Sequence, residues 1–245
     1  APPGASDLPG LEVAGEIVAL GAGAGASAVA KQLLLLGFDP AERLFSIVSD
    51  LRESDYDELS AVQARLEHRG IANYFGWQSQ YLIGLIQGPD VSTERFAELL
   101  PELGEFRTGI AGVQAPAEVP AALRNARVLA AAVNAPGLRT LRDDWLAAIS
   151  HAEPRITDAL VEEIFAPFEE LSDYSREELS RVIEGYFSTN GTIAAISKLL
   201  FRHRNTVRNR LAQVEELTGL RLGVPRDTAL LAVAFAAWRR NGVRR

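Results

Sequence analysis

The feature that most constrains the fold is a change of hydrophobic pattern at Pro136-Gly137. Before this point, short runs rich in β-branched and aromatic residues alternate with amphipathic segments. After it, the strand signals stop and every segment to Arg245 has the pattern of helix or turn. The change predicts an α+β unit followed by an all-helical one, and 245 residues suffice for both.

In the first part, the segments predict the order β-α-β-β-α-β-α. The predicted strands are residues 43–50, 71–77, 80–87 and 106–113, and the predicted helices are 54–70, 92–103 and 117–133. Residues 71–77 and 80–87 lie so close together that they must form a hairpin. Serine opens a predicted capping box at Ser54-Asp57 and at Ser175-Glu178. The expected divisions are an N-terminal helical segment (1–38), an α+β domain (39–137), linker helices (138–174) and a helical domain (175–245).

The charge is unevenly distributed along the chain. The net charge is −7, but residues 1–171 hold 12 basic and 25 acidic residues, whereas residues 172–245 hold 13 basic and 7 acidic ones. The window 185–214 contains no Asp or Glu but several cations, namely Lys198, Arg202, Arg204, Arg208 and Arg210. A solvated helix face normally mixes both signs, so a window of one sign indicates a surface for phosphates.

Residues 192–218 have the pattern of a helix-turn-helix. Thr192 can cap a short helix to Leu200, residues 201–203 form a tight turn, and a longer helix runs to Thr218 with Gly219 as its stop. At about 100° per residue, one arc of the second helix holds Val207, Leu211, Val214 and Thr218, which are expected to pack on Ile196, Leu199 and Leu200. The opposite arc carries side chains that can reach base edges in a major groove: Arg202, Asn205, Thr206, Asn209 and Gln213. The alternative is an ordinary solvated helix in a helical bundle.

These residues carry a resemblance to a known family. The run His203-Arg-Asn-Thr-Val-Arg-Asn-Arg-Leu211, followed by Glu215-Glu-Leu-Thr-Gly219, resembles the C-terminal helix-turn-helix domain of the PucR/CdaR family of bacterial transcriptional regulators. The resemblance covers about residues 155–240. It implies a DNA-binding regulator, and members of the family respond to small metabolites.

The resemblance also implies a domain related to the GGDEF cyclase fold before the helix-turn-helix. In an active cyclase, the hairpin carries carboxylates that help to hold metal. Here the corresponding turn is Trp77-Gln-Ser-Gln-Tyr81, which has no carboxylate. We therefore expect a degenerate GGDEF-like α/β sandwich without cyclase activity, which serves dimerisation or signal relay.

A competing interpretation concerns the glycines near the N-terminus. Gly21-Ala-Gly-Ala-Gly-Ala26, followed by an apolar helix and a strand ending at Asp50, can be a dinucleotide-binding βαβ unit. A flexible loop between two short helices is the plainer interpretation. A nucleotide- or dinucleotide-binding protein that uses the Gly21–Ala26 loop is thus the alternative function, and an interaction scaffold that binds neither nucleotide nor DNA is a third.

Composition excludes several other classes of protein. The absence of cysteine excludes disulfides, Cys-ligated metals and thiol catalysis, and it fits a cytoplasmic setting. No apolar run has the length of a membrane span. The start at Ala1, together with the absence of Met, is interpreted as a processed chain or a fragment.

The sequence thus predicts a regulator that binds double-stranded DNA as a homodimer, responds to a small-molecule effector, needs no cofactor or metal, and is not an enzyme. Base contacts are assigned to Arg202, Asn205, Thr206, Asn209 and Gln213. Phosphate contacts are assigned to Thr192, Lys198, His203, Arg204, Arg208 and Arg210.

Overall fold

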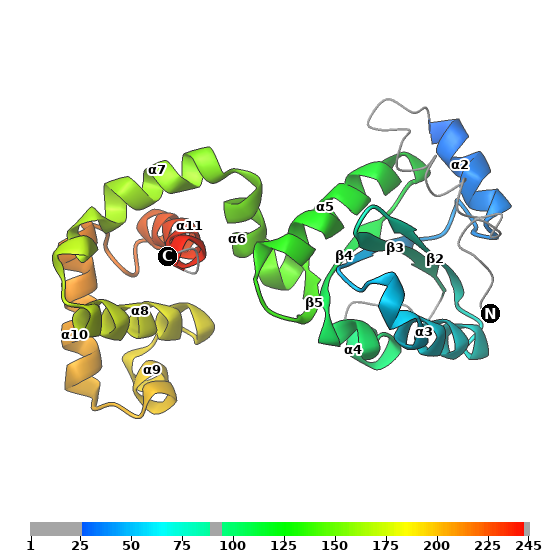
Figure 1. The fold of residues 1–245 in the computed structure, drawn as a ribbon. Coiled ribbons are helices and arrows are strands. Elements are labelled where there is room, and N and C mark those ends of the chain that lie inside the picture. Colours follow the sequence, from blue (N-terminus) through cyan, green and yellow to red (C-terminus); the bar gives the residue numbers. More distant parts are fainter. Residues whose placement is uncertain (1–25, 89–94, 243–245) are drawn as a thin grey trace. The chain divides into compact units, whose positions relative to one another are not determined.

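The computed structural model describes residues 26–88 and 95–242, and it divides the chain into two compact units, residues 1–148 and 149–245. The first unit is built on a five-stranded sheet with the order β2-β3-β1-β4-β5 (Figure 1). The strands are β1 (Leu44–Ser49), β2 (Ala72–Gln78), β3 (Tyr81–Gln87), β4 (Arg107–Val113) and β5 (Gly137–Thr140). The predicted hairpin is confirmed as β2 and β3, and the predicted α+β order is confirmed from β1 to α5 (Val119–Ala132).

Helices cover both faces of this sheet (Figure 1). On one face, Ile47 and Ile86 of the sheet pack with α3 (Tyr56–His68) and α4 (Phe96–Leu99). On the other face, Val48 and Leu85 pack with α2 (Ala26–Leu35) and α5. The central strand β1 lies between the two helical layers and is therefore buried at all six positions.

Gly109 allows α5 to lie directly on β4. A Cβ atom at this position would lie 1.9 Å from the backbone oxygen of Ala126 and 2.7 Å from the backbone nitrogen of Ala130. Any side chain here would force the helix away from the strand, so glycine sets the distance between these two elements.

The predicted end of strand structure at Pro136-Gly137 is wrong. Residues 137–140 form β5, which pairs in parallel with β4, with Thr108 opposite Leu138. The segment is four residues long, half-buried and contains Gly137 and Arg139, so it lacks the apolar run by which a strand is detected in sequence.

Residues 138–174 differ from the expected run of linker helices. After β5 comes α6 (Leu141–Ala152), whose backbone kinks at Asp144, and then α7 (Pro154–Phe165). Helix α7 packs on α11 (Pro225–Gly242), so it belongs to the core of the second unit. The expected N-terminal helical segment is described from Ala26 onward as α2, and Val29 and Leu33 join the core of the first unit.

The second unit is helical as predicted, with α8 (Asp173–Ser188), α9 (Ile193–Leu200), α10 (Arg204–Thr218) and α11 after α7 (Figure 1). Both predicted capping boxes are wrong. Helix α8 is capped by Ser172, whose hydroxyl accepts from the Ser175 N–H at 3.3 Å. Ser54 lies inside a short 3-10 helix (Glu53–Asp55), and there the Asp55 carboxylate accepts from the Arg52 N–H at 3.0 Å. At α8 a neighbouring serine carries the same hydroxyl acceptor and takes the cap, whereas α3 has no side-chain cap.

Candidate nucleic-acid interface

Helices α8, α9 and α10 form a three-helix unit around a small apolar core. Val182 of α8, Ile196 of α9 and Val207 and Leu211 of α10 are buried together, as predicted for the last three. Two predicted contacts differ: Leu199 is 49% exposed, and Val214 packs with Phe165 and Phe235 in the larger core of the second unit. This core fixes which face of α10 points outward.

Local hydrogen bonds define the turn between α9 and α10. The Thr192 hydroxyl caps α9 by accepting from the Ala195 N–H at 3.3 Å, as the sequence predicted. Helix α9 ends at Phe201 in the left-handed region (φ +52°), and the Arg202 N–H donates to the Ser197 oxygen at 3.0 Å. His203 then caps α10, because its Nδ1 accepts from the Asn205 N–H at 3.2 Å. The sequence assigned His203 to phosphate contact and did not predict this capping role.

The outward face of α10 carries most of the side chains assigned to base contact. Asn205, Thr206 and Asn209 are exposed, and they follow one another along the helix from its N-terminus. Gln213, one turn further, is half-buried, and its Oε1 accepts from Arg210 Nη1 at 2.8 Å. The first two turns of α10 are therefore accessible, and the third is occupied by an internal contact.

The assigned cations fall into two groups. Lys198, Arg204 and Arg208 are exposed, and within the described part of the chain none of them is paired with a carboxylate. Arg202, by contrast, bonds to both carboxylate oxygens of Glu178 on α8, at 3.2 and 3.3 Å. Glu178 lies outside the acid-free window 185–214 in sequence but beside it in space, which a count along the chain does not reveal.

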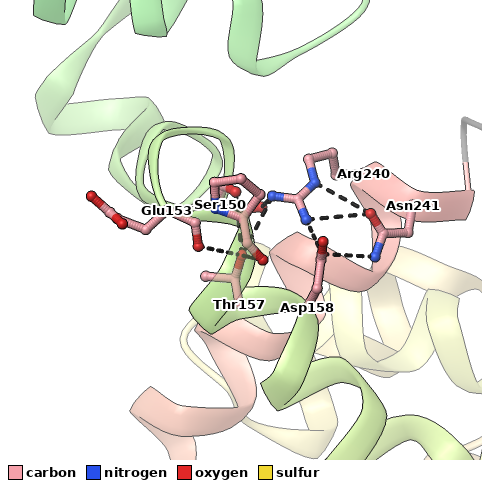
Figure 2. A network of polar contacts seen from close by, with 7 residues as sticks. Ser150, Glu153, Thr157, Asp158, Arg240 and Asn241 are labelled. Carbon is pink, nitrogen blue, oxygen red and sulfur yellow. Dashed lines mark hydrogen bonds and ion pairs between the residues drawn. The ribbon is translucent and has the colours of Figure 1, made fainter.

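Two basic residues at the end of α11 have carboxylate partners, and Figure 2 shows the contacts of one of them, Arg240. Arg240 is 9% exposed; it pairs with Asp158 of α7, and its Nη1 donates to the Ser150 hydroxyl at 3.1 Å and to the Thr157 hydroxyl at 3.4 Å. Arg239 pairs with Glu184 of α8. Arg240 therefore ties α11 to α7, whereas Arg239 stays exposed and has its charge balanced by Glu184.

In the first unit, the hairpin turn consists of Ser79 and Gln80, which bring no carboxylate to it. Asp50, at the end of β1, accepts from the Arg107 side chain at 2.7 Å. Among residues 26–88 and 95–242, no group of three or more His, Cys, Asp or Glu side chains is arranged to hold a metal ion.

The glycines of the competing dinucleotide interpretation, Gly21, Gly23 and Gly25, lie outside the described residues. The surrounding sheet can still be compared with a βαβ unit. Strand β1, which would be the second strand of that unit, is paired antiparallel with β3 on one side and with β4 on the other. Both edges of β1 are therefore already occupied, and a parallel partner cannot lie directly beside it.

Two family models each match one of the two units. A family model for the PucR C-terminal helix-turn-helix domain matches residues 179–237, and a model for the GGDEF-like domain matches residues 21–132. The carbohydrate diacid regulator of Escherichia coli (strain K12) is 47% identical over 57 residues, which are 23% of this chain and 15% of that protein. The crystal structure of a regulator of polyketide synthase expression from Bifidobacterium adolescentis is 18% identical, with a TM-score of 0.45, over 95% of this chain and 98% of that one.

The matched domains define the class: a helix-turn-helix protein with a GGDEF-like α+β domain. Both matched domains are those predicted by the resemblance of the His203–Leu211 motif to the PucR/CdaR family of regulators. The matched segment spans only 15% of the length of the carbohydrate diacid regulator. No helix within residues 26–88 and 95–242 has the length and apolar character needed to cross a membrane.

Proposed function

We propose that this chain is a sequence-specific, double-stranded DNA-binding transcriptional regulator. The observation that carries the proposal is an exposed polar face at the N-terminal end of α10, formed by Asn205, Thr206 and Asn209. The other face of this helix is buried through Val207 and Leu211. A helix held in this way can enter a major groove with its first turns, as the second helix of a helix-turn-helix does.

The proposed roles follow the chemistry of each side chain. Asn209 and Asn205 present amides that can bond adenine, and Thr206 adds a hydroxyl and a methyl group. Lys198, Arg204 and Arg208 are exposed cations for phosphates, and the hydroxyl of Thr192 lies at the start of α9. Arg202 reads a base once its contact with Glu178 opens. When the contact between Arg210 and Gln213 opens, Gln213 reads a base and Arg210 contacts a phosphate. His203 also contacts a phosphate.

The experiment compares two exposed residues of α10 that have different proposed roles. Asn209→Ala should relax sequence preference in a selection from a random duplex pool, whereas Arg208→Ala should weaken all duplexes about equally and reduce the salt slope by about one. Arg155→Ala, an exposed arginine on α7, is the matched control and should change neither. If both α10 variants bind like the parent, the assignment of this face is wrong.

The regulator acts as a homodimer in this proposal. Support comes from Trp145 on α6, a large aromatic side chain of the first unit that is 42% exposed. An exposed aromatic side chain is suited to contact with the same side chain of a second copy. A dimer also suits the DNA, because a single recognition helix buries little surface, and two helices span half-sites about 34 Å apart.

The proposed effector is a small anionic metabolite that binds the first unit. Support comes from a pocket of about 300 Å³ between the β2–β3 turn and α5, lined by Ser79, Tyr81, Arg124 and Arg127. The Arg127 guanidinium lies 4.9 Å from the centre of the Tyr81 ring. This cation–π contact holds the Arg127 side chain at the wall of the pocket. Two arginines in a pocket suit a carboxylate.

A thermal-shift screen of small carboxylates tests this part of the proposal. A ligand of the pocket should raise the Tm of the parent and leave the Arg124→Gln/Arg127→Gln double variant unshifted. An equal shift in both proteins would place the ligand elsewhere.

The protein has no enzymatic activity and acts in the cytoplasm in this proposal. The β2–β3 turn at Ser79-Gln80 has no carboxylate, which supports the absence of cyclase chemistry.

A further inference from the structure

The turn between α9 and α10 contains an unusual backbone conformation at Phe201. Within residues 26–88 and 95–242, Ser79 and Phe201 are the two non-glycine residues with positive φ, and the other positive-φ positions are glycines, among them Gly219, the C-cap of α10. For a bulky side chain the left-handed region is unfavourable, because Cβ approaches the following carbonyl oxygen. Glycine is the residue that commonly ends a helix in this geometry.

No burial of the Phe201 ring in the folded chain offsets this unfavourable backbone conformation. Phe201 is 94% exposed, whereas Phe165, Phe168 and Phe235 of the same unit are buried in its core. Burial is the usual source of stabilisation by an aromatic side chain, and here it is missing. Glycine at position 201 would therefore give a more stable domain, and the ring must be explained by something outside the fold.

The surroundings of Phe201 indicate which partner the ring contacts. Phe201 directly precedes Arg202, which is paired with Glu178, and it lies two residues from the exposed His203 and three residues from the exposed Arg204 and Lys198. The ring is therefore exposed beside cations at the N-terminal end of α10. An apolar surface on another protein would have to cover these charges, whereas duplex DNA attracts them. In the major groove, the 5-methyl group of thymine is the apolar feature of the base edges, and phenylalanine is a side chain that contacts it.

We propose that Phe201 is a specificity-determining residue that contacts a thymine methyl group beside the bases read by α10. This inference rests on the proposed DNA-binding function. The left-handed conformation directs a large apolar side chain away from the three-helix core at the point where the recognition helix begins.

The test uses Phe201→Gly, because stability and DNA affinity should then change in opposite directions. The Tm of the variant should rise by about 2–4 °C, since strain is removed. Its affinity for the operator selected by the parent protein should fall about three- to tenfold. Leu199→Ala, which shortens an apolar side chain that is 49% exposed on the same helix, is the control and should leave the affinity unchanged.

Replacement of thymine by uracil, which removes only the methyl group, identifies the contact. The parent should lose affinity about three- to tenfold when one thymine in each half-site is replaced, and Phe201→Gly should lose nothing further from that replacement. The proposal would be overturned if Phe201→Gly bound the operator as tightly as the parent does. It would also be overturned if the substitution reduced affinity by the same factor on the thymine duplex and on the uracil duplex. Loss of the dimer in sedimentation would also overturn it, because a second copy would then cover the ring. If the parent binds no duplex at all, the proposed function itself fails, and that outcome is recognisable before any variant is made.

Discussion

Replacing Arg240 by methionine should destabilise the helical unit by about 2–3 kcal/mol. Methionine keeps much of the aliphatic volume of a side chain that is 9% exposed, but it removes the guanidinium that bonds to Asp158, Ser150 and Thr157. Hydrogen bonds to a charged group contribute about 1.5–3 kcal/mol, and breaking a fully buried ion pair costs about 3–5 kcal/mol. Asp158 is 44% exposed and keeps its bond from Asn241 at 3.0 Å, so it can be rehydrated and the loss falls at the lower end.

The assay is urea unfolding followed by the fluorescence of Trp238, in a background with Trp77→Phe and Trp145→Phe. Trp238 stacks on Phe165 with 5.1 Å between ring centres, so it reports on the second unit alone. With a urea slope of about 1–3 kcal/mol/M, the midpoint should fall by about 1–3 M. Arg155→Met on α7 is exposed and should keep the parent midpoint. An unchanged midpoint in Arg240→Met would refute the conclusion that this network holds α11 on α7.

Three further predictions concern the first unit and α6. The hydrogen bond from Arg65 lowers the pKa of Glu102. The Glu102 carboxylate therefore stabilises the fold above its unfolded pKa of about 4.3, and this contribution is lost as the pH falls through the folded pKa. In an acid titration followed by circular dichroism, Glu102→Gln should lose less stability with falling pH than the parent does. Gly109→Ala should lower the Tm by several degrees or prevent folding, whereas Gly112→Ala, where a Cβ would meet only the flexible tip of a side chain at 3.1 Å, should fold normally. Trp145→Glu should shift the protein toward monomer in analytical ultracentrifugation without changing its circular dichroism, and a dimer of unchanged strength would exclude this face.

Alternating apolar runs and strong periodicity made much of this fold predictable. The hairpin of β2 and β3 followed from two adjacent runs of β-type residues, and α9 and α10 from a cap at Thr192 and a stop at Gly219. β5 was missed because a short edge strand such as Gly137–Thr140 gains its pairing from β4 and not from its own apolar residues.

The side-chain assignments were less predictable because charge partners are set in three dimensions. Glu178 comes from α8 to Arg202, and Asp158 comes from α7 to Arg240, across sequence separations of 24 and 82 residues. A count along the chain showed an acid-free window and a basic end, but it could not show which cations these acids neutralise. Local conformation was equally hidden: a phenylalanine in the left-handed region at position 201 has no signal in a hydrophobic pattern.

The most direct test of the DNA-binding proposal is binding of the parent chain to a random-sequence duplex pool over a salt series, with the retained duplexes sequenced. We expect a steep fall of affinity with salt and an enriched motif of two related half-sites, about one helical turn apart. Absence of binding at low salt would contradict the account of α9 and α10 as a DNA-reading unit.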